Sequence, residues 1–306
     1  MGAAAQPPSA ARSGAGVGST GPSVYIRPVN THHMAYGLLK GKRGVISGAL
    51  NEQSIAWKVA TMAHAEGARI VLTNAPVAMR MGEIDKLAQD TGSIIIGADA
   101  TKDEDLENLF TGAKEHLGGP VDFVLHSIGM SPNVRKGRTY GDLNYDWYRQ
   151  TLDISAMSFH RMIQAAVKTD SLAERGSIVA LSYIAAQRVF PGYGDMADAK
   201  ALLESIGRSW GYHLGIQKKI RVNTVSQSPS VTTAGSGIKG FQGLFDMAQA
   251  MSPLGNAPTE DCAAYVISLF SDLTRYVTMQ NLYHDGGFSS TGGTPMVVEK
   301  FTPAED

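Results

Sequence analysis

Short apolar runs alternate with longer helical patterns along this chain from Met34 onward. The runs are five or six residues long and rich in Val, Ile and Leu, as in strands that are buried on both faces. They lie at Arg43–Gly48, Arg69–Thr73, Ser93–Gly97, Val121–His126, Ser177–Ser182, Ile220–Val225 and Gln280–His284. The helical patterns between them cover Ser54–Glu66, Met79–Asp90, Lys102–Leu117, Tyr145–Lys168, Tyr193–Leu214 and Glu260–Ser271. The alternation predicts an α/β Rossmann-like fold, with a doubly wound, mainly seven-stranded parallel sheet and helices on both of its faces.

The first 33 residues differ from the rest. They are rich in Ala, Gly, Pro and Ser without apolar periodicity, which predicts a disordered leader or extension. No acidic residue precedes Glu52, which is typical of a transit peptide, but only Arg12 and Arg27 are basic and no amphipathic pattern accompanies them. We favour the alternative, a fusion remnant or upstream extension before a start at Met34. Residues 34–306 are then predicted to form a single domain.

Composition excludes several functional classes. The net charge of −1 gives no electrostatic footprint for nucleic acid, and no apolar run approaches the roughly 20 residues that cross a bilayer. The single Cys262 and the eight His residues show no metal-ligand spacing, so no metal is expected. A lone cysteine suits a reducing compartment, and we expect the cytoplasm.

The first strand–helix turn is where this fold holds a dinucleotide pyrophosphate, against free backbone N–H groups and the positive end of a helix. Gly48 permits a tight turn, Ser54 and Ala56 are small enough for close approach, and Ser54 is a candidate helix cap. The chain has no intact GxGxxG here, so an ordinary strand–helix turn with a serine cap is the alternative.

The next strand ends narrow the choice of nucleotide. Asn74 stands where an acidic residue would accept ribose hydroxyls and an arginine would favour a 2′-phosphate, so NADH is favoured and NADPH stays an alternative. Asp99 is placed to reach the adenine, or else to act as an acid before the next helix. His126 is interpreted as a packed strand-end histidine.

Tyr193 and Lys200 form the candidate catalytic pair. They are seven residues apart, so on a helix they share one face, about 10 Å apart. A tyrosine hydroxyl can donate to a substrate oxygen on which negative charge develops, and a lysine ammonium can hold the cofactor ribose and stabilise that charge. The alternative is a surface lysine and a loop tyrosine that never meet.

The order of these motifs resembles a known family. A SIA turn, HSIG, LSY, Tyr-x6-Lys, IRVNT, TTAGSGIK and HDGGF follow one another as in the bacterial NAD(P)H-dependent enoyl-[acyl-carrier-protein] reductases of the short-chain dehydrogenase/reductase superfamily. The resemblance runs from about Leu38 to Gly287. Other reductases of the superfamily use Tyr-x3-Lys, but here Met196 stands four residues before Lys200, and Tyr183 lies ten residues before Tyr193.

The resemblance implies reduction of the trans-2 double bond of enoyl-[acyl-carrier-protein] thioesters by NADH in type II fatty acid synthesis. Tyr193 would bond the thioester carbonyl, Lys200 would hold the nicotinamide ribose, and Tyr183 would line the acyl site. The implied cofactor contacts are Gly48, Ser54, Ile55, Asp99, Ala100, Ser127, Gly129, Lys200 and Thr232. The implied substrate contacts are Tyr183, Met196, Phe241 and Phe245.

The resemblance also implies a mobile substrate lid at about residues 226–251, hinged at Gly235, Gly237, Gly240 and Gly243, and a homotetramer. Its partner would be acyl carrier protein, which is acidic. We therefore expect a basic patch at the lid mouth, with Lys239, Arg135 and Arg138 as candidates.

Two features depart from the family pattern. Gln227-Ser228-Pro229 replaces the common Ala-Gly-Pro, and Asp195 puts an acid beside the expected site. Two other functions compete with the reductase. One is a carbonyl reductase, against which Met196 argues, and the other is a catalytically silent NAD(H) sensor, which could dispense with Tyr193 and Lys200. The tail from Ser289 has no interpretation.

Overall fold

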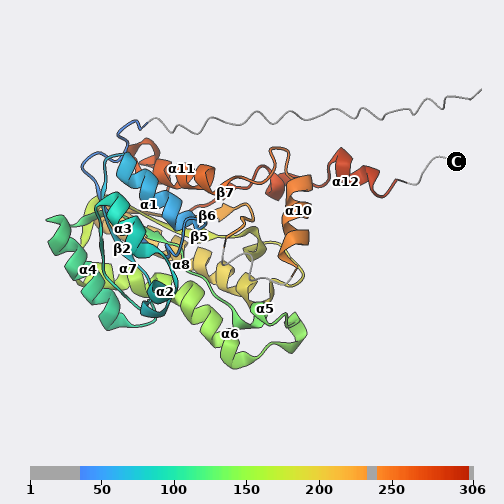
Figure 1. Cartoon of the computed structure of the whole chain (residues 1–306), viewed down its shortest axis with the longest axis horizontal. Coiled ribbons are helices and arrows are strands. Elements are labelled where there is room, and N and C mark those ends of the chain that lie inside the picture. The colour runs from blue at the N-terminus through green and yellow to red at the C-terminus, as the bar shows by residue number, and fades with distance from the viewer. Residues whose placement is uncertain (1–34, 233–239, 303–306) are drawn as a thin grey trace, which may run out of the picture. The chain divides into compact units, whose positions relative to one another are not determined.

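The computed structural model describes residues 35–232 and 240–302. In this part of the chain, seven parallel strands form one sheet in the order β3-β2-β1-β4-β5-β6-β7 (Figure 1). Their bounds are β1 Arg43–Ser47, β2 Arg69–Thr73, β3 Ile94–Ile95, β4 Val121–His126, β5 Leu172–Ser182, β6 Arg221–Gln227 and β7 Asn281–His284. The order reverses between β1 and β4, which confirms the doubly wound fold.

Helices cover both faces of this sheet. The longer ones are α1 Ile55–Ala65, α3 Ile84–Thr91, α4 Asp103–Leu117, α6 Tyr145–Leu152, α7 Ser158–Lys168, α8 Gly194–Lys218, α10 Phe241–Met251 and α11 Thr259–Phe270. The short ones are α2 Pro76–Met81, α5 Pro132–Arg135 and α12 Pro295–Glu299. α4, α7 and α8 share one apolar core with the sheet, whereas α1, α3 and α11 share the other (Figure 1). No helix within the described residues is long and apolar enough to cross a bilayer.

The inner strands carry apolar side chains on both sides because both faces of the sheet are covered. Val124 packs into the core beneath α4 and α7, and its neighbours Phe123 and Leu125 pack into the core beneath α1 and α11. The same alternation places Val45 and Ile46 of β1 in opposite cores. The inner strands pair with a neighbour on each side, so their backbone groups are open only at their ends.

Two predicted helices differ in the structure. The helix expected at Met79–Asp90 is divided into α2 and α3 at Gly82, where an added Cβ would lie 2.4 Å from the carbonyl oxygen of Leu50. The helix expected at Tyr145–Lys168 contains one π turn at Asp153–Met157, between α6 and α7. Helical periodicity shows neither the contact between Gly82 and Leu50 nor the π turn.

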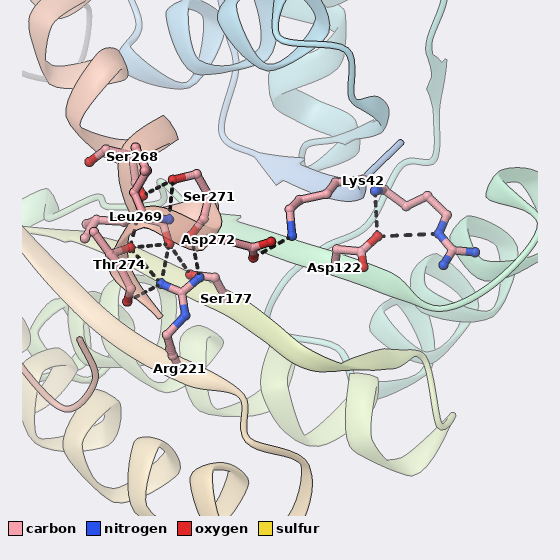
Figure 2. A network of polar contacts seen from close by, with 11 residues as sticks. Lys42, Asp122, Ser177, Arg221, Ser268, Leu269, Ser271, Asp272 and Thr274 are labelled. Carbon is pink, nitrogen blue, oxygen red and sulfur yellow. Dashed lines mark hydrogen bonds and ion pairs between the residues drawn. The ribbon is translucent and has the colours of Figure 1, made fainter. Parts of the chain in front are cut away.

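A buried arginine ties the last strands to the helix layer (Figure 2). Arg221 of β6 is 4% exposed, and its guanidinium donates to the carbonyl oxygens of Leu269, Ser271 and Thr274 at 2.6, 3.1 and 3.1 Å. Burial removes water from the guanidinium and lowers the pKa of Arg221. The three carbonyl oxygens accept the hydrogen bonds that water would otherwise accept. Beside it, Lys42 forms an ion pair with Asp272 at 3.0 Å.

Replacing the guanidinium, Arg221→Met, leaves these carbonyls without their shared donor. We expect the variant to lose about 2–4 kcal/mol of stability, measured by urea unfolding at fixed protein concentration. Arg275→Met, an exposed arginine on the same turn, is the control and is expected within about 0.5 kcal/mol of the parent. Equal stability of the two variants would contradict this account of the network.

Candidate active site

A cavity of about 220 Å³ opens where β4, β5 and β6 end. It is lined by residues that follow these strands, by the first turns of α8, and by α10. The residues are Ile55, Ser127, Ile128, Gly129, Met130, Ser131, Val134, Arg135, Leu181, Ser182, Tyr183, Tyr193, Met196, Lys200, Gln227, Ser228, Pro229, Ser230, Thr232, Phe241 and Leu244. The cavity therefore unites most of the predicted catalytic and substrate residues with Ile55, Ser127, Gly129 and Thr232 of the predicted cofactor set.

The turn after β1 approaches the turn after β4 closely. Gly48 has a φ of +90°, and a Cβ added there would lie 2.0 Å from the carbonyl oxygen of Ser127. Below it, the Ser47 hydroxyl donates to the Leu125 carbonyl at 2.8 Å. Only glycine permits this contact, which lies at the point where the strand order reverses and where this fold binds nucleotides.

Ser54 does not cap α1 with its side chain, contrary to the sequence expectation. It occupies the residue before the helix, but its hydroxyl donates to the Asn51 carbonyl at 2.7 Å and accepts from the Leu50 N–H at 3.3 Å. The Ser54 side chain therefore closes the preceding loop. The next residue, Ile55, begins α1 and lines the cavity, so the positive end of this helix lies at the cavity.

The adenine end of the predicted site lies outside this cavity. Asp99 accepts from both the N–H and the hydroxyl of Thr101, at 3.0 and 2.8 Å, and Ala100 is buried beside it. Asn74 is held by local backbone, since its amide donates to Ala49 and accepts from Ala75. The roles of Asp99 and Ala100 in cofactor binding stay predictions.

The three predicted catalytic side chains meet in the cavity. The rings of Tyr183, which follows β5, and Tyr193, which precedes α8, lie 5.0 Å apart between centroids. Lys200, two turns along α8, is 8% exposed, and its ammonium donates to the Leu181 carbonyl at 2.8 Å. The alternative of an exposed lysine and a remote tyrosine is therefore wrong.

Burial controls the protonation of these groups. Desolvation raises the pKa of Tyr193, and the charge interaction with the neighbouring Tyr183 raises it further by a smaller amount. The phenol therefore stays protonated and can donate a hydrogen bond. Desolvation lowers the pKa of Lys200 to about 8, and the carboxylate of Glu204, one turn further along α8, opposes that shift. Glu204 is itself buried and accepts from Ser182 at 2.7 Å.

His126 has the packed role expected of it. It is fully buried at the end of β4, where its Nε2 lies 2.8 Å from the Ser158 hydroxyl. Burial lowers the pKa of His126 to about 3, so the ring is neutral and is not a general acid at neutral pH.

The lid segment contributes one apolar wall. Phe241 and Leu244 of α10 line the cavity, whereas Phe245 lies against Phe241, 6.1 Å between ring centroids, and does not line it. Residues 233–239, which hold two of the expected glycine hinges, lie outside the described residues. Phe245 as a substrate contact and the hinges stay predictions.

Asp195 is a buried carboxylate in the first turn of α8. It accepts from the hydroxyl of Ser131 at 2.6 Å, from the amide of Asn133 at 2.8 Å and from the hydroxyl of Thr151 at 2.9 Å. These donors come from the loop after β4, from α5 and from α6. The carboxylate therefore fixes the catalytic helix against the loop that forms the opposite wall of the cavity.

Sequence reasoning missed the supports of that loop. Ser131 caps α5 by accepting from the Val134 N–H at 3.0 Å, and Ser155 of the π turn contacts both the N–H and the carbonyl of Met130. A serine directly before Pro132 is a helix-start signal and could have predicted α5. The π turn leaves no comparable pattern.

Comparisons with known proteins agree with this geometry. A model of the enoyl-(acyl carrier protein) reductase family matches residues 48–289. The enoyl-[acyl-carrier-protein] reductase [NADH] FabI of Rickettsia bellii is 36% identical over 267 residues, which are 86% of this chain and all of that protein. The FabI of Bacillus subtilis is 32% identical over 83% of this chain and 98% of its own length. Among solved structures, the FabI–NADH complex from Alistipes finegoldii is 65% identical, with a TM-score of 0.85 over 86% of this chain and 93% of that one.

This chain belongs to the enoyl-[acyl-carrier-protein] reductase family. The resemblance found in its motifs is thereby confirmed, and so is the fold that the resemblance implied. The polar cluster around Asp195 holds the catalytic helix of this reductase in place.

In this reductase, Asp195→Asn places an amide N–H against one of the donors that now bond the carboxylate. We expect a stability loss of about 1–3 kcal/mol and a kcat about tenfold lower, because the cavity wall and α8 shift relative to each other. Thermal unfolding and steady-state kinetics measure the two effects.

The control is Asp198→Asn, one turn further along α8. Asp198 accepts from the hydroxyls of Tyr148 and Tyr140, which can rotate to suit an amide, and it does not line the cavity. An Asp195→Asn enzyme that matches the Asp198→Asn enzyme in kcat would contradict the role given to the cluster.

Proposed function

We propose that the chain reduces the trans-2 double bond of enoyl-[acyl-carrier-protein] thioesters with NADH, in type II fatty acid synthesis. The observation that carries this proposal is the union of Tyr193, Tyr183 and Lys200 in one cavity at the strand ends. Family membership supports the same reaction, since its relatives bear the name enoyl-[acyl-carrier-protein] reductase [NADH].

The residues present fit a nicotinamide nucleotide. The Tyr183 hydroxyl is buried without a hydrogen-bond partner among the described residues, although it lines the cavity. Gly129 lies beside the Lys200 ammonium, since a Cβ added to it would be 3.7 Å from that nitrogen. Ser127, Gly129 and Lys200 would hold the nicotinamide ribose of bound NADH, which would supply a hydride to the β-carbon of the enoyl thioester.

Tyr193 and Lys200 then act on the charge that develops. When the β-carbon accepts a hydride, electron density moves to the thioester oxygen and gives an enolate. The protonated phenol of Tyr193 donates a hydrogen bond to that oxygen, and the Lys200 ammonium stabilises it through its positive charge. Protonation at the α-carbon completes the saturated thioester, with Tyr183 lining the acyl site and Met196, Phe241 and Leu244 excluding water.

The competing functions make different demands on these residues. A carbonyl reductase of this superfamily would need a proton donor four residues before Lys200, and Met196 has none. A silent NAD(H) sensor gives no reason for two tyrosines and a buried lysine to share one cavity.

The direct test is the loss of NADH absorbance with a trans-2-enoyl thioester and, in parallel, a 3-ketoacyl thioester. We expect turnover of the enoyl substrate alone, and a loss of roughly 10²–10³ in kcat in Tyr193→Phe. Turnover of the ketone would favour the carbonyl reductase, and NADH binding without either turnover would favour the sensor.

The Lys200 ammonium gives the reaction a pH dependence. Because the pKa of Lys200 is lowered to about 8, its charge is present below that pH and lost above it. We expect kcat/KM for NADH, which reports the free enzyme, to fall above about pH 8. In Glu204→Gln the opposing carboxylate is gone, so the fall should begin at lower pH; a flat profile to pH 9.5 in the parent enzyme would contradict this assignment.

Acyl carrier protein is the proposed partner, docked at a basic patch near the lid. Arg135 lines the cavity, which supports its place at the mouth. Arg138 forms an ion pair with Asp142 at 2.9 Å and lies over the Trp147 ring, and Lys239 lies outside the described residues.

We also propose a homotetramer, a cytoplasmic location, and a single domain over 34–306 with a lid at about 226–251. The leader at 1–33 lies outside the described residues.

Charge reversal tests the patch. We expect Arg135→Glu with Lys239→Glu to raise KM for the carrier-bound enoyl substrate about tenfold, because an acidic partner is repelled. KM for the same acyl group on a small uncharged thiol should change little. An unchanged KM for the carrier-bound substrate would remove the patch from the proposal.

A further inference from the structure

Gln227, the last residue of β6, has a buried amide with no partner. Its side chain is 4% exposed and lines the cavity. Neither its Nε2 nor its Oε1 has a hydrogen-bond partner among the described residues. Gln227 begins the Gln227-Ser228-Pro229 segment, which departs from the Ala-Gly-Pro that the resemblance leads one to expect.

Several other buried side chains of the described residues leave one polar atom unpaired, but in Gln227 a donor and an acceptor are both unpaired, in contrast to Asn223 on the same strand. Asn223 is equally buried, but its amide donates to the Val277 carbonyl at 2.8 Å and accepts from the Gln280 N–H at 3.1 Å. Buried polar groups are nearly always paired, because leaving one unpaired forfeits its hydrogen bonds to water. The unpaired amide of Gln227 therefore indicates a ligand that supplies both a donor and an acceptor.

The place of Gln227 in the cavity narrows that ligand. It stands at the end of β6, and Leu181 and Ser182 at the end of the neighbouring β5 line the same cavity. In doubly wound folds, nucleotides bind against the carboxyl ends of the strands. The adjacent Ser228 hydroxyl is already used, since it accepts from the Ala257 N–H at 3.0 Å.

We propose that Gln227 recognises the carboxamide of the nicotinamide ring, with its Nε2 donating to the carboxamide oxygen and its Oε1 accepting from the carboxamide N–H. The proposal rests on the proposed function, because it takes NADH as the cofactor. A thioester carbonyl would be a poorer partner, since it offers an acceptor only and leaves Oε1 unpaired. By holding the carboxamide, Gln227 fixes the rotation of the ring and thus the direction in which the hydride leaves.

The test measures binding without turnover. Fluorescence titration of the full chain gives dissociation constants for NADH and for reduced 3-acetylpyridine adenine dinucleotide, in which a methyl ketone replaces the carboxamide and removes its N–H donors. We expect the parent protein to bind the analogue about tenfold more weakly than NADH. This comparison needs no variant and so does not depend on whether a substitution folds.

Gln227→Met keeps the length of the side chain and removes its donor and acceptor. We expect it to bind NADH about tenfold more weakly, and the ratio between analogue and NADH to move toward one. Gln280→Met, which changes an exposed glutamine between β6 and β7, is the control and should keep both dissociation constants. NADH binding by Gln227→Met at the parent affinity, or with the parent ratio, would overturn the inference.

The two proposals fail in different ways. If Gln227→Met shows the predicted loss of NADH affinity and shift in ratio but the parent protein does not reduce an enoyl thioester, the proposed reaction fails and the role of Gln227 stands. If it reduces the enoyl thioester while Gln227→Met binds NADH normally, the role of Gln227 fails and the reaction stands.

Discussion

The burial of both faces of the sheet is the constraint on which the rest of the structure depends. Helices cover each face, and every inner strand pairs with a neighbour on both sides, so the backbone groups of the inner strands are open only where the strands end. The carboxyl ends of β4, β5 and β6 lie side by side, and the residues that follow them converge on one cavity. Gly48 brings the turn after β1 against the turn after β4, which no side chain at that position would permit.

Helix α8 turns this edge of the sheet into a site for chemistry. Tyr193 precedes it, Asp195 anchors its first turn, and Lys200 and Glu204 follow on successive turns. The helix must hold a charged ammonium in a nearly dry environment, and it does so with a backbone carbonyl on one side and a carboxylate on the other. Positioning and charge are thus supplied by one element, while the loop after β4 and α10 supply the walls.

Much of this was predictable from the sequence. The apolar runs located all seven strands because a strand buried on both faces has a simple pattern, and the spacing of Tyr193 and Lys200 placed them on a shared helix face. The division of one predicted helix at Gly82 was not predictable, because it depends on contact with Leu50, more than 30 residues away in the sequence. The prediction of a cap by the Ser54 side chain was wrong for a related reason: its hydroxyl bonds Asn51 and Leu50 in the preceding loop instead of a helix N–H, and periodicity does not show that choice. The polar cluster around Asp195 joins three segments that only the fold brings together, so the sequence showed an acid near the site but not its partners.

The measurement that tests the account most directly follows the hydride itself. With NADH deuterated at C4 of the nicotinamide and a trans-2-enoyl thioester, the account predicts that deuterium appears at the β-carbon of the saturated product, as mass spectrometry and NMR would show. Deuterium at the carbonyl carbon, or a product without deuterium, would contradict the claim that this cavity delivers hydride to the double bond.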